Sequence, residues 1–260
     1  MSWREVYASD LQGVVGVSIV PALFLVHLAV TKRRDAHGAV LPLAARFVRG
    51  YALLFALETI LDPIASGPLM RALGLADGPM PTIVMVAFVL LGDFRVFFLV
   101  LALAAYGRAD AAGAARLPSL PRLAAQAALW TLPVPLVAVA AEAALRAVRD
   151  DVPAQSIWLA YELAFLALAL GLRRVLVPAR VPAEQPRLRG YLRAVLAYVA
   201  VYYALWATAD VAIMIGGFDA GWGLRIVPNQ LYYGFWIPVV YGLFFSRRYA
   251  STSRSVHASR

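Results

Sequence analysis

The sequence contains no cysteine, only three histidines and a single lysine among its 260 residues. The lack of cysteine excludes disulfide bonds, thiolate metal sites and a cysteine nucleophile. The histidines, His27, His37 and His257, are too scattered for a histidine-rich metal cluster. Charged residues make up 15% of the chain, whereas a soluble domain has about 25%. This composition excludes an ordinary cytosolic enzyme, and we predict no metal site and no cofactor.

Long apolar runs dominate the chain, of which 62% is hydrophobic. A helix that spans a bilayer needs about 20 predominantly apolar residues. Seven stretches meet this requirement, near residues 11–31, 47–68, 81–105, 121–145, 153–175, 190–216 and 224–246. We therefore predict an all-α integral membrane protein, with a single seven-transmembrane-helix bundle over residues 1–250 and a disordered cytoplasmic tail over 251–260.

The distribution of basic residues predicts the orientation of these helices. Cytoplasmic segments of membrane proteins carry an excess of lysine and arginine. If the N-terminus lies outside, most of the 24 basic residues fall in the four cytoplasmic segments, near 32–49, 108–122, 173–193 and 247–260. We predict an external N-terminus and a cytoplasmic C-terminus, in a pattern that fits a bacterial inner membrane. The net charge of +9 then faces lipid headgroups, and nucleic acid is not predicted as a partner.

Five acidic residues lie deep within the predicted helices. These residues are Glu58, Asp62, Asp93, Glu162 and Asp210. Insertion scales assign about 2.5–3.5 kcal/mol to an Asp at mid-helix, and intramembrane acids usually face a bundle interior and mark ion, proton or substrate paths. Counting at about 1.5 Å per residue places all five between the midplane and the outer surface. Their common depth predicts one acidic pocket that opens to the outside.

The spacing of the acids adds detail to this pocket. Glu58 and Asp62 lie one turn apart on one helix face, so their repulsion favours protonation of one carboxyl group or a cation held between them. Alternatively, Asp62 simply ends the helix before Pro63. Arg95 needs an acidic partner on another helix, and we expect that partner to be Glu58. This pair alone is as compatible with a structural role as with a functional one.

Glu162 and Asp210 have no basic residue deep within their own helices, which favours a functional role. Aromatic and amide side chains accompany the acids. Tyr203 and Trp206 share a helix face with Asp210, and Asn229, Gln230, Tyr233 and Trp236 lie near the start of the last helix. Aromatic faces next to carboxylates suit organic cations or a developing positive charge.

These features leave three hypotheses for function. The first is a protein that binds or transports protons, cations or a small cationic solute. The second is an intramembrane acid–base enzyme that acts on a lipid or isoprenoid, for example by proton-initiated cyclisation. The third is a structural or assembly subunit, in which the acids pair with arginines and only fix helix packing. The oligomeric state is not predicted.

Two groups of membrane proteins resemble the chain in architecture. Seven spans with an external N-terminus match the gross topology of microbial rhodopsins. A retinal Schiff base needs a lysine in the last span, however, and Lys32 lies in a predicted loop. Small membrane terpene cyclases are similar in size and in their intramembrane acids, but no shared motif transfers their residues to this chain.

Overall fold

The computed structural model describes residues 1–31, 43–111 and 119–246, and these residues form helices without any strand. The predicted tail over 251–260 lies outside the described residues, as do Lys32, His37 and His257. The all-helical prediction is therefore confirmed over the described ranges.

Four short π-helical segments (η) are interspersed among the α-helices (α) of the described residues. The first half of the chain forms α1 (Trp3–Ala8), η1 (Leu11–Gly16), α2 (Val17–Val30), α3 (Leu43–Ile64), η2 (Ala65–Leu69), α4 (Met70–Ala72) and α5 (Met80–Ala111). The second half forms α6 (Leu120–Thr131), α7 (Pro133–Val148), α8 (Gln155–Gly171), η3 (Leu172–Leu176), α9 (Val177–Arg180), α10 (Pro186–Gly216), α11 (Ala220–Asn229), η4 (Gln230–Phe235) and α12 (Trp236–Phe245).

Five helical stretches of the described chain are long and apolar enough to cross a membrane. They are Leu11–Val30, Leu43–Ala72, Met80–Ala109, Leu120–Val148 and Pro186–Gly216. Each coincides with one of the predicted spans. The other two predicted spans, 153–175 and 224–246, fall on helices α8–η3 and α11–η4–α12, which are not among the five. The chain thus has the helices of a multi-pass membrane protein.

Prolines mark several of the joints within these stretches. Pro63 does not end α3, because the helix continues to Ile64 and then enters η2. The expectation that Asp62 terminates the helix is therefore wrong. A proline lacks the N–H that closes the ordinary helical turn, so the hydrogen-bond ladder must change its register nearby. Pro228 likewise lies two residues before η4, and Pro133 begins α7 directly after the interruption at Leu132.

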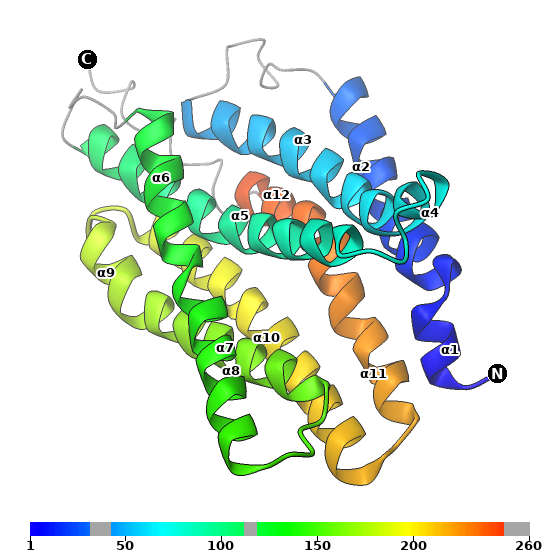
Figure 1. Ribbon diagram of the computed structural model, residues 1–260. Coiled ribbons are helices and arrows are strands. Elements are labelled where there is room, and N and C mark those ends of the chain that lie inside the picture. Colours follow the sequence, from blue (N-terminus) through cyan, green and yellow to red (C-terminus); the bar gives the residue numbers. More distant parts are fainter. Residues whose placement is uncertain (32–42, 112–118, 247–260) are drawn as a thin grey trace, which may run out of the picture.

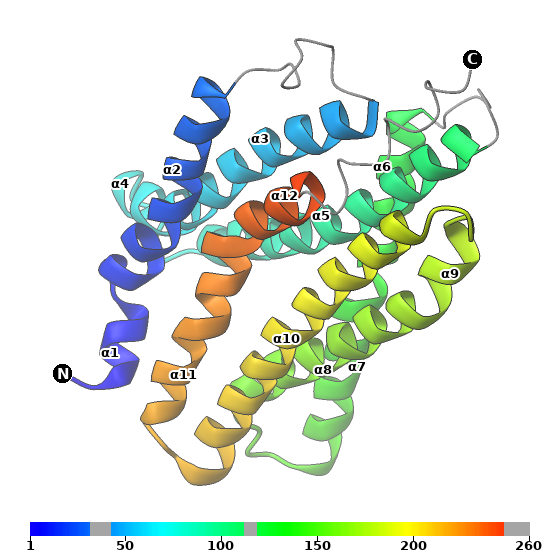
Figure 2. The ribbon, with the colours of Figure 1, turned by 180° about the vertical axis from the view of Figure 1, so that it is seen from behind.

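The helices pack as a ring of neighbours. In chain order, α2 packs on α3, α3 on α5, α5 on α6, α7 on α8, α8 on α10 and α10 on α11. The segment η4 packs on α2 and closes the ring, while α12 packs on α3. Figures 1 and 2 show α10 between α8 and α11, with α1 beside α11 at the N-terminal end of the chain.

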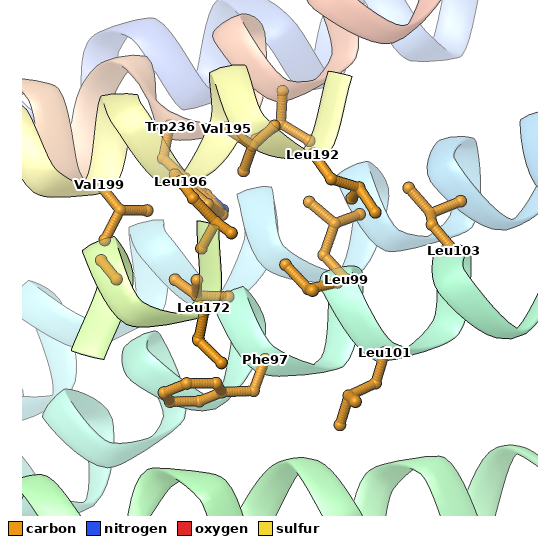
Figure 3. Close-up of a cluster of buried hydrophobic side chains, with 14 of the residues drawn as sticks. Phe97, Leu99, Leu101, Leu103, Leu172, Leu192, Val195, Leu196, Val199 and Trp236 are labelled. Carbon is orange, nitrogen blue, oxygen red and sulfur yellow. The ribbon is translucent and has the colours of Figure 1, made fainter. Parts of the chain in front are cut away.

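An apolar cluster surrounds α5 and lines the facing side of α10 (Figure 3). It contains Phe97, Leu99, Leu101, Leu103, Leu172, Leu192, Val195, Leu196, Val199 and Trp236. The buried acids begin where this cluster ends. Asp93 lies one turn before Phe97 on α5, and Tyr203 lies one turn after Val199 on α10. The interior is therefore divided along α5 and α10 into an apolar part and a polar part.

Candidate functional site

All five acids predicted to lie within the bundle are buried. Glu58 is the most exposed of them, at 7%, and Asp93 and Asp210 are fully buried. Two arginines accompany the acids: Arg95 is fully buried, and the side chain of Arg225 is 11% exposed. Six of these seven side chains form three groups, which we call the Arg95, Asp93 and Arg225 groups, and Asp62 lies beside the first.

The Arg95 group joins α5 to α3 and η4. Arg95 Nη1 lies 3.4 Å from Glu58 Oε2 and donates a 3.1 Å hydrogen bond to Thr59 Oγ1. Arg95 Nη2 donates a 2.6 Å hydrogen bond to the carbonyl oxygen of Tyr232. The predicted pairing of Arg95 with Glu58 is confirmed. A buried guanidinium needs such partners, because an unpaired charge in the bilayer interior is costly.

Aromatic rings surround the Arg95 guanidinium. Its Cζ atom lies 4.3 Å from the ring centroid of Tyr232 and 5.3 Å from that of Trp236, which are cation–π distances. Trp236 Nε1 donates to Tyr51 Oη at 3.1 Å, and Tyr51 in turn donates to the carbonyl oxygen of Arg95 at 2.9 Å. The predicted aromatic residue Trp236 thus contacts Arg95 and helps to hold it between three helices.

Asp62 lies near the Arg95 group but has no arginine in contact. Glu58 lies one turn before it on α3, and the hydroxyl group of Tyr233 lies within hydrogen-bonding reach of its carboxyl group. Tyr233, which the sequence predicted as an aromatic residue of the site, is therefore a neighbour of Asp62.

The Asp93 group consists of one acid and two tyrosines. Tyr203 of α10 donates a 2.5 Å hydrogen bond to Asp93 Oδ1, and Tyr161 of α8 donates to Oδ2. Phe165 stacks on Tyr203, with 4.3 Å between the ring centroids. Each carboxyl oxygen of Asp93 thus receives a phenol donor, but no ion pair to Asp93 is present among the described residues. The sequence placed Tyr203 on the helix face of Asp210, whereas the structure places its hydroxyl group on Asp93, and Tyr161 was missed.

The Arg225 group joins α8, α10 and α11. Arg225 Nη1 donates to Asp210 Oδ1, and Arg225 Nη2 lies 3.8 Å from Glu162 Oε1. The sequence argument for these two acids rested on the lack of a basic residue within their own helices. The structure corrects that argument, because the basic partner comes from a neighbouring helix.

The N-terminal helix α1 covers the Arg225 group. Tyr7 Oη accepts a 3.3 Å hydrogen bond from Arg225 Nε and another of 3.3 Å from Asn229 Nδ2. Asn229 Oδ1 also accepts a 3.0 Å hydrogen bond from Trp206 Nε1. Asn229 and Trp206, both predicted as site residues, are therefore neighbours of the Arg225 group rather than of Asp93.

Asp219 fixes α1 in this position. Its two carboxylate oxygens accept hydrogen bonds from the backbone N–H groups of Trp3 and Arg4, at 2.6 and 3.1 Å. Free N–H groups at the start of a helix favour a carboxylate, so Asp219 caps α1 from a distant part of the chain. The ring of Tyr7 lies 5.5 Å from that of Trp222 on α11, which extends the contact.

Gln230, also a predicted site residue, lies apart from the acids. Its Nε2 atom is 3.5 Å from Oε1 of Gln12, so the amides connect the two π-helical segments η1 and η4. The small residues Gly16 and Gly234 lie beside these amides and give them room. π-Helical turns often occur at functional sites, and η4 also carries Tyr232, whose carbonyl oxygen binds Arg95.

Aromatic rings connect the three groups. The ring of Tyr232, which lies over Arg95, is 5.3 Å from that of Trp206. The ring of Trp206 is 5.6 Å from that of Tyr203, which binds Asp93. Trp206 also reaches the Arg225 group through Asn229. The predicted acids therefore do not share one set of contacts, but they belong to one continuous polar and aromatic interior.

Several residues of this interior escaped the sequence argument, among them Tyr7, Tyr161 and Arg225. Arg225 lies one turn before Asn229, so the period of the helix places both on one face. Tyr161 directly precedes Glu162, and adjacent residues of a helix point in different directions. Tyr7 lies before the first apolar run, where the sequence gives no signal that the chain folds back.

The charges of the interior do not balance. Glu58 is paired with Arg95 and Asp210 with Arg225, and Asp62, Asp93 and Glu162 remain as acids in excess. A buried carboxylate without a counter-charge is costly, so such groups take up protons or cations. The described residues offer no group of three acidic or histidine side chains that could hold a metal ion.

Comparisons of this chain with protein families, curated proteins and solved structures give no match.

Proposed function

We propose that the protein spans the membrane seven times, with its N-terminus outside and its C-terminus in the cytoplasm, and that its buried acids bind and transport protons. The orientation rests on the excess of arginine in the predicted cytoplasmic segments. The two helices that are not among the five apolar spans carry Glu162 and Arg225, and charged side chains of this kind lie inside a bundle rather than against lipid.

Asp93 is the observation that carries this proposal. It is fully buried, it accepts hydrogen bonds from two tyrosines, and it lies two residues from Arg95 without pairing with it. A purely structural carboxylate in a membrane protein is expected to pair with a basic group or with backbone N–H groups. The two phenol donors stabilise the ionised carboxylate, whereas burial without a paired basic group favours the protonated form, and this opposition suits an acid that exchanges a proton.

The apolar cluster along α5 and α10 supports one type of transport. It lies on the side of Asp93 that leads to the predicted cytoplasmic ends of both helices. The cluster contains no carboxyl group that could accept a proton from Asp93 on its way to the cytoplasm. Passage to the cytoplasm therefore requires a helix movement or the entry of water, as in a transporter that exposes one site to each side in turn.

The structural alternative accounts for part of the site. It explains Glu58, Glu162 and Asp210, which contact arginines, but it does not explain Asp62 or Asp93. The alternative of an acid–base enzyme would use the same acids. It differs from proton transport in that it yields a modified lipid. Lipid extracts of cells with and without the protein differ if it modifies a lipid, and they are unchanged if it transports protons.

Proton flux into liposomes tests the proposal. The purified protein is reconstituted with a pH-sensitive dye inside the vesicles, and the wild type is compared with Asp93→Asn and with Glu142→Gln. Glu142 pairs with Arg146 at the surface of α7, so its variant controls for the loss of a carboxyl group outside the network. We expect flux in the wild type and the control, and at least about tenfold less in Asp93→Asn. Equal flux in all three proteins contradicts the proposal.

A further inference from the structure

Glu162 and Asp210 form a close carboxyl pair that faces one guanidinium, that of Arg225. Their carboxyl groups lie within hydrogen-bonding reach of each other. One oxygen of each, Glu162 Oε1 and Asp210 Oδ1, faces Arg225. The other oxygens, Glu162 Oε2 and Asp210 Oδ2, are buried and have no hydrogen-bond donor among the described residues.

Among the described residues, Arg225 is the basic side chain that pairs with these acids, and Arg4 of α1 lies over the ring of Trp222 without an ion pair to either acid. On α1 and α11, the neighbours of Arg225 are the neutral side chains of Tyr7 and Asn229. On α7, which also packs on α8, Glu142 and Arg146 pair with each other at the surface. Two ionised carboxylates would therefore leave one negative charge without compensation and two acceptor oxygens without a donor.

A single proton removes both problems. A proton on one carboxyl group reduces the charge of the pair to −1, which Arg225 balances. The same proton makes a hydrogen bond between the two acids and supplies the missing donor. Charge-assisted hydrogen bonds of this kind are about twice as strong as neutral ones.

We propose that Glu162 carries this proton and donates it to Asp210, so that Asp210 is the ionised partner of Arg225. The contacts of Arg225 distinguish the two acids, because its Nη1 donates directly to Asp210, whereas its Nη2 stays 3.8 Å from Glu162. Glu162 is the acid that exchanges its proton, and Asp210 holds Arg225 in place. The shared proton is a property of the folded protein and does not depend on the proposed function. Only the statement that Glu162 exchanges this proton rests on proton transport.

Two matched variants test the assignment. Glu162→Gln keeps a donor at the position of the proton, whereas Asp210→Asn removes the carboxylate that Arg225 contacts. We expect the melting temperature of Glu162→Gln in detergent to stay within about 2 °C of the wild type, and that of Asp210→Asn to fall by about 5 °C or more, as breaking a buried ion pair does. Equal losses in the two variants, or a larger loss for Glu162→Gln, overturn the assignment.

Infrared spectroscopy of the wild type gives a second test that needs no variant to be stable. The protein is labelled with ¹³C-glutamate and embedded in lipid at neutral pH, so that the carbonyl band of a protonated glutamic acid shifts on labelling. We expect one such band, and we expect Glu162→Gln to lack it. A spectrum without a protonated glutamic acid overturns the inference, whatever the proton flux of the protein. A spectrum with that band but a protein without flux leaves the shared proton in place and overturns the proposed function instead.

Discussion

Tyr203 of α10 donates a 2.5 Å hydrogen bond to Asp93 of α5, across 110 residues of sequence. Tyr161 of α8 donates to the other carboxyl oxygen, so three helices meet at one buried acid. Hydrogen bonds between membrane helices contribute about 0.6 kcal/mol on average, so these two bonds offset little of the cost of burying Asp93. We explain the arrangement by a functional role, in which the two tyrosines orient an acid that gains and loses a proton.

Removal of either tyrosine hydroxyl group should alter proton flux more than stability. Tyr203→Phe and Tyr161→Phe each remove one hydrogen bond, for which we expect a loss of about 0.6 kcal/mol and no more than about 1.7 kcal/mol. Flux should fall severalfold, because one donor no longer orients Asp93. Tyr106→Phe provides the control, since Tyr106 packs on Phe47 away from Asp93. Thermal unfolding and liposome flux measure the two effects, and a variant that loses stability without losing flux contradicts the role given to Asp93.

The ion pair between Arg95 and Glu58 should be strongly coupled. Arg95→Gln leaves Glu58 buried without its counter-charge, for which we expect a loss of about 3–5 kcal/mol in the free energy of unfolding. The double variant Arg95→Gln/Glu58→Gln removes both charges and should recover part of that loss. Unfolding of the wild type, both single variants and the double variant completes the cycle. Strictly additive losses would show that the pair does not interact in the folded protein.

Gly92 of α5 should be intolerant of a side chain. A Cβ atom at this position would overlap the hydroxyl end of Tyr232, whose ring lies over Arg95 and packs on Trp206. Tyr232 is buried and cannot move aside freely, so Gly92→Ala should destabilise the protein by about 1–3 kcal/mol.

Gly50→Ala is the matched control for this change. Gly50 lies in α3 with no atom near the added methyl group, and alanine should stabilise its helix by up to about 1 kcal/mol. Thermal unfolding compares the two variants. A Gly92→Ala variant as stable as Gly50→Ala would mean that Tyr232 is not packed against α5 as described.

The docking of α1 should depend on Asp219. Asp219→Ala removes the acceptor of the Trp3 and Arg4 N–H groups, for which a loss of about 0.5–2 kcal/mol is typical of a helix cap. We expect faster hydrogen exchange over residues 3–8 and little change elsewhere, as measured by mass spectrometry. The surface variant Asp77→Asn should leave this exchange unchanged. Exchange over residues 3–8 that does not respond to Asp219→Ala would argue against the described cap.

The membrane helices were predictable because their physical cause is local. About 20 apolar residues in a row suffice to indicate a span, and each predicted span falls on a helical stretch. The burial of Asp93, Glu162 and Asp210 also followed from the cost of placing an acid next to lipid. The pairing of Arg95 with Glu58 followed from the same argument, since a deep arginine has few partners to choose from.

The partners of the other acids depend on which helices are neighbours, and the sequence alone does not indicate this. Arg225 reaches Glu162 and Asp210 from another helix. Tyr7 reaches the same group because Asp219 holds α1 against α11. Such contacts follow from how the helices surround one another, which a single sequence does not specify.

The most direct test of the central claim is the number of protonated carboxyl groups in the membrane-embedded protein at neutral pH. Infrared spectra with ¹³C-labelled aspartate measure this number for the aspartates, and Asp93→Asn assigns the band of Asp93. The account predicts a protonated aspartate band in the wild type that weakens in Asp93→Asn and disappears on alkalinisation of the outer side only. A wild-type spectrum with every aspartate ionised would contradict it.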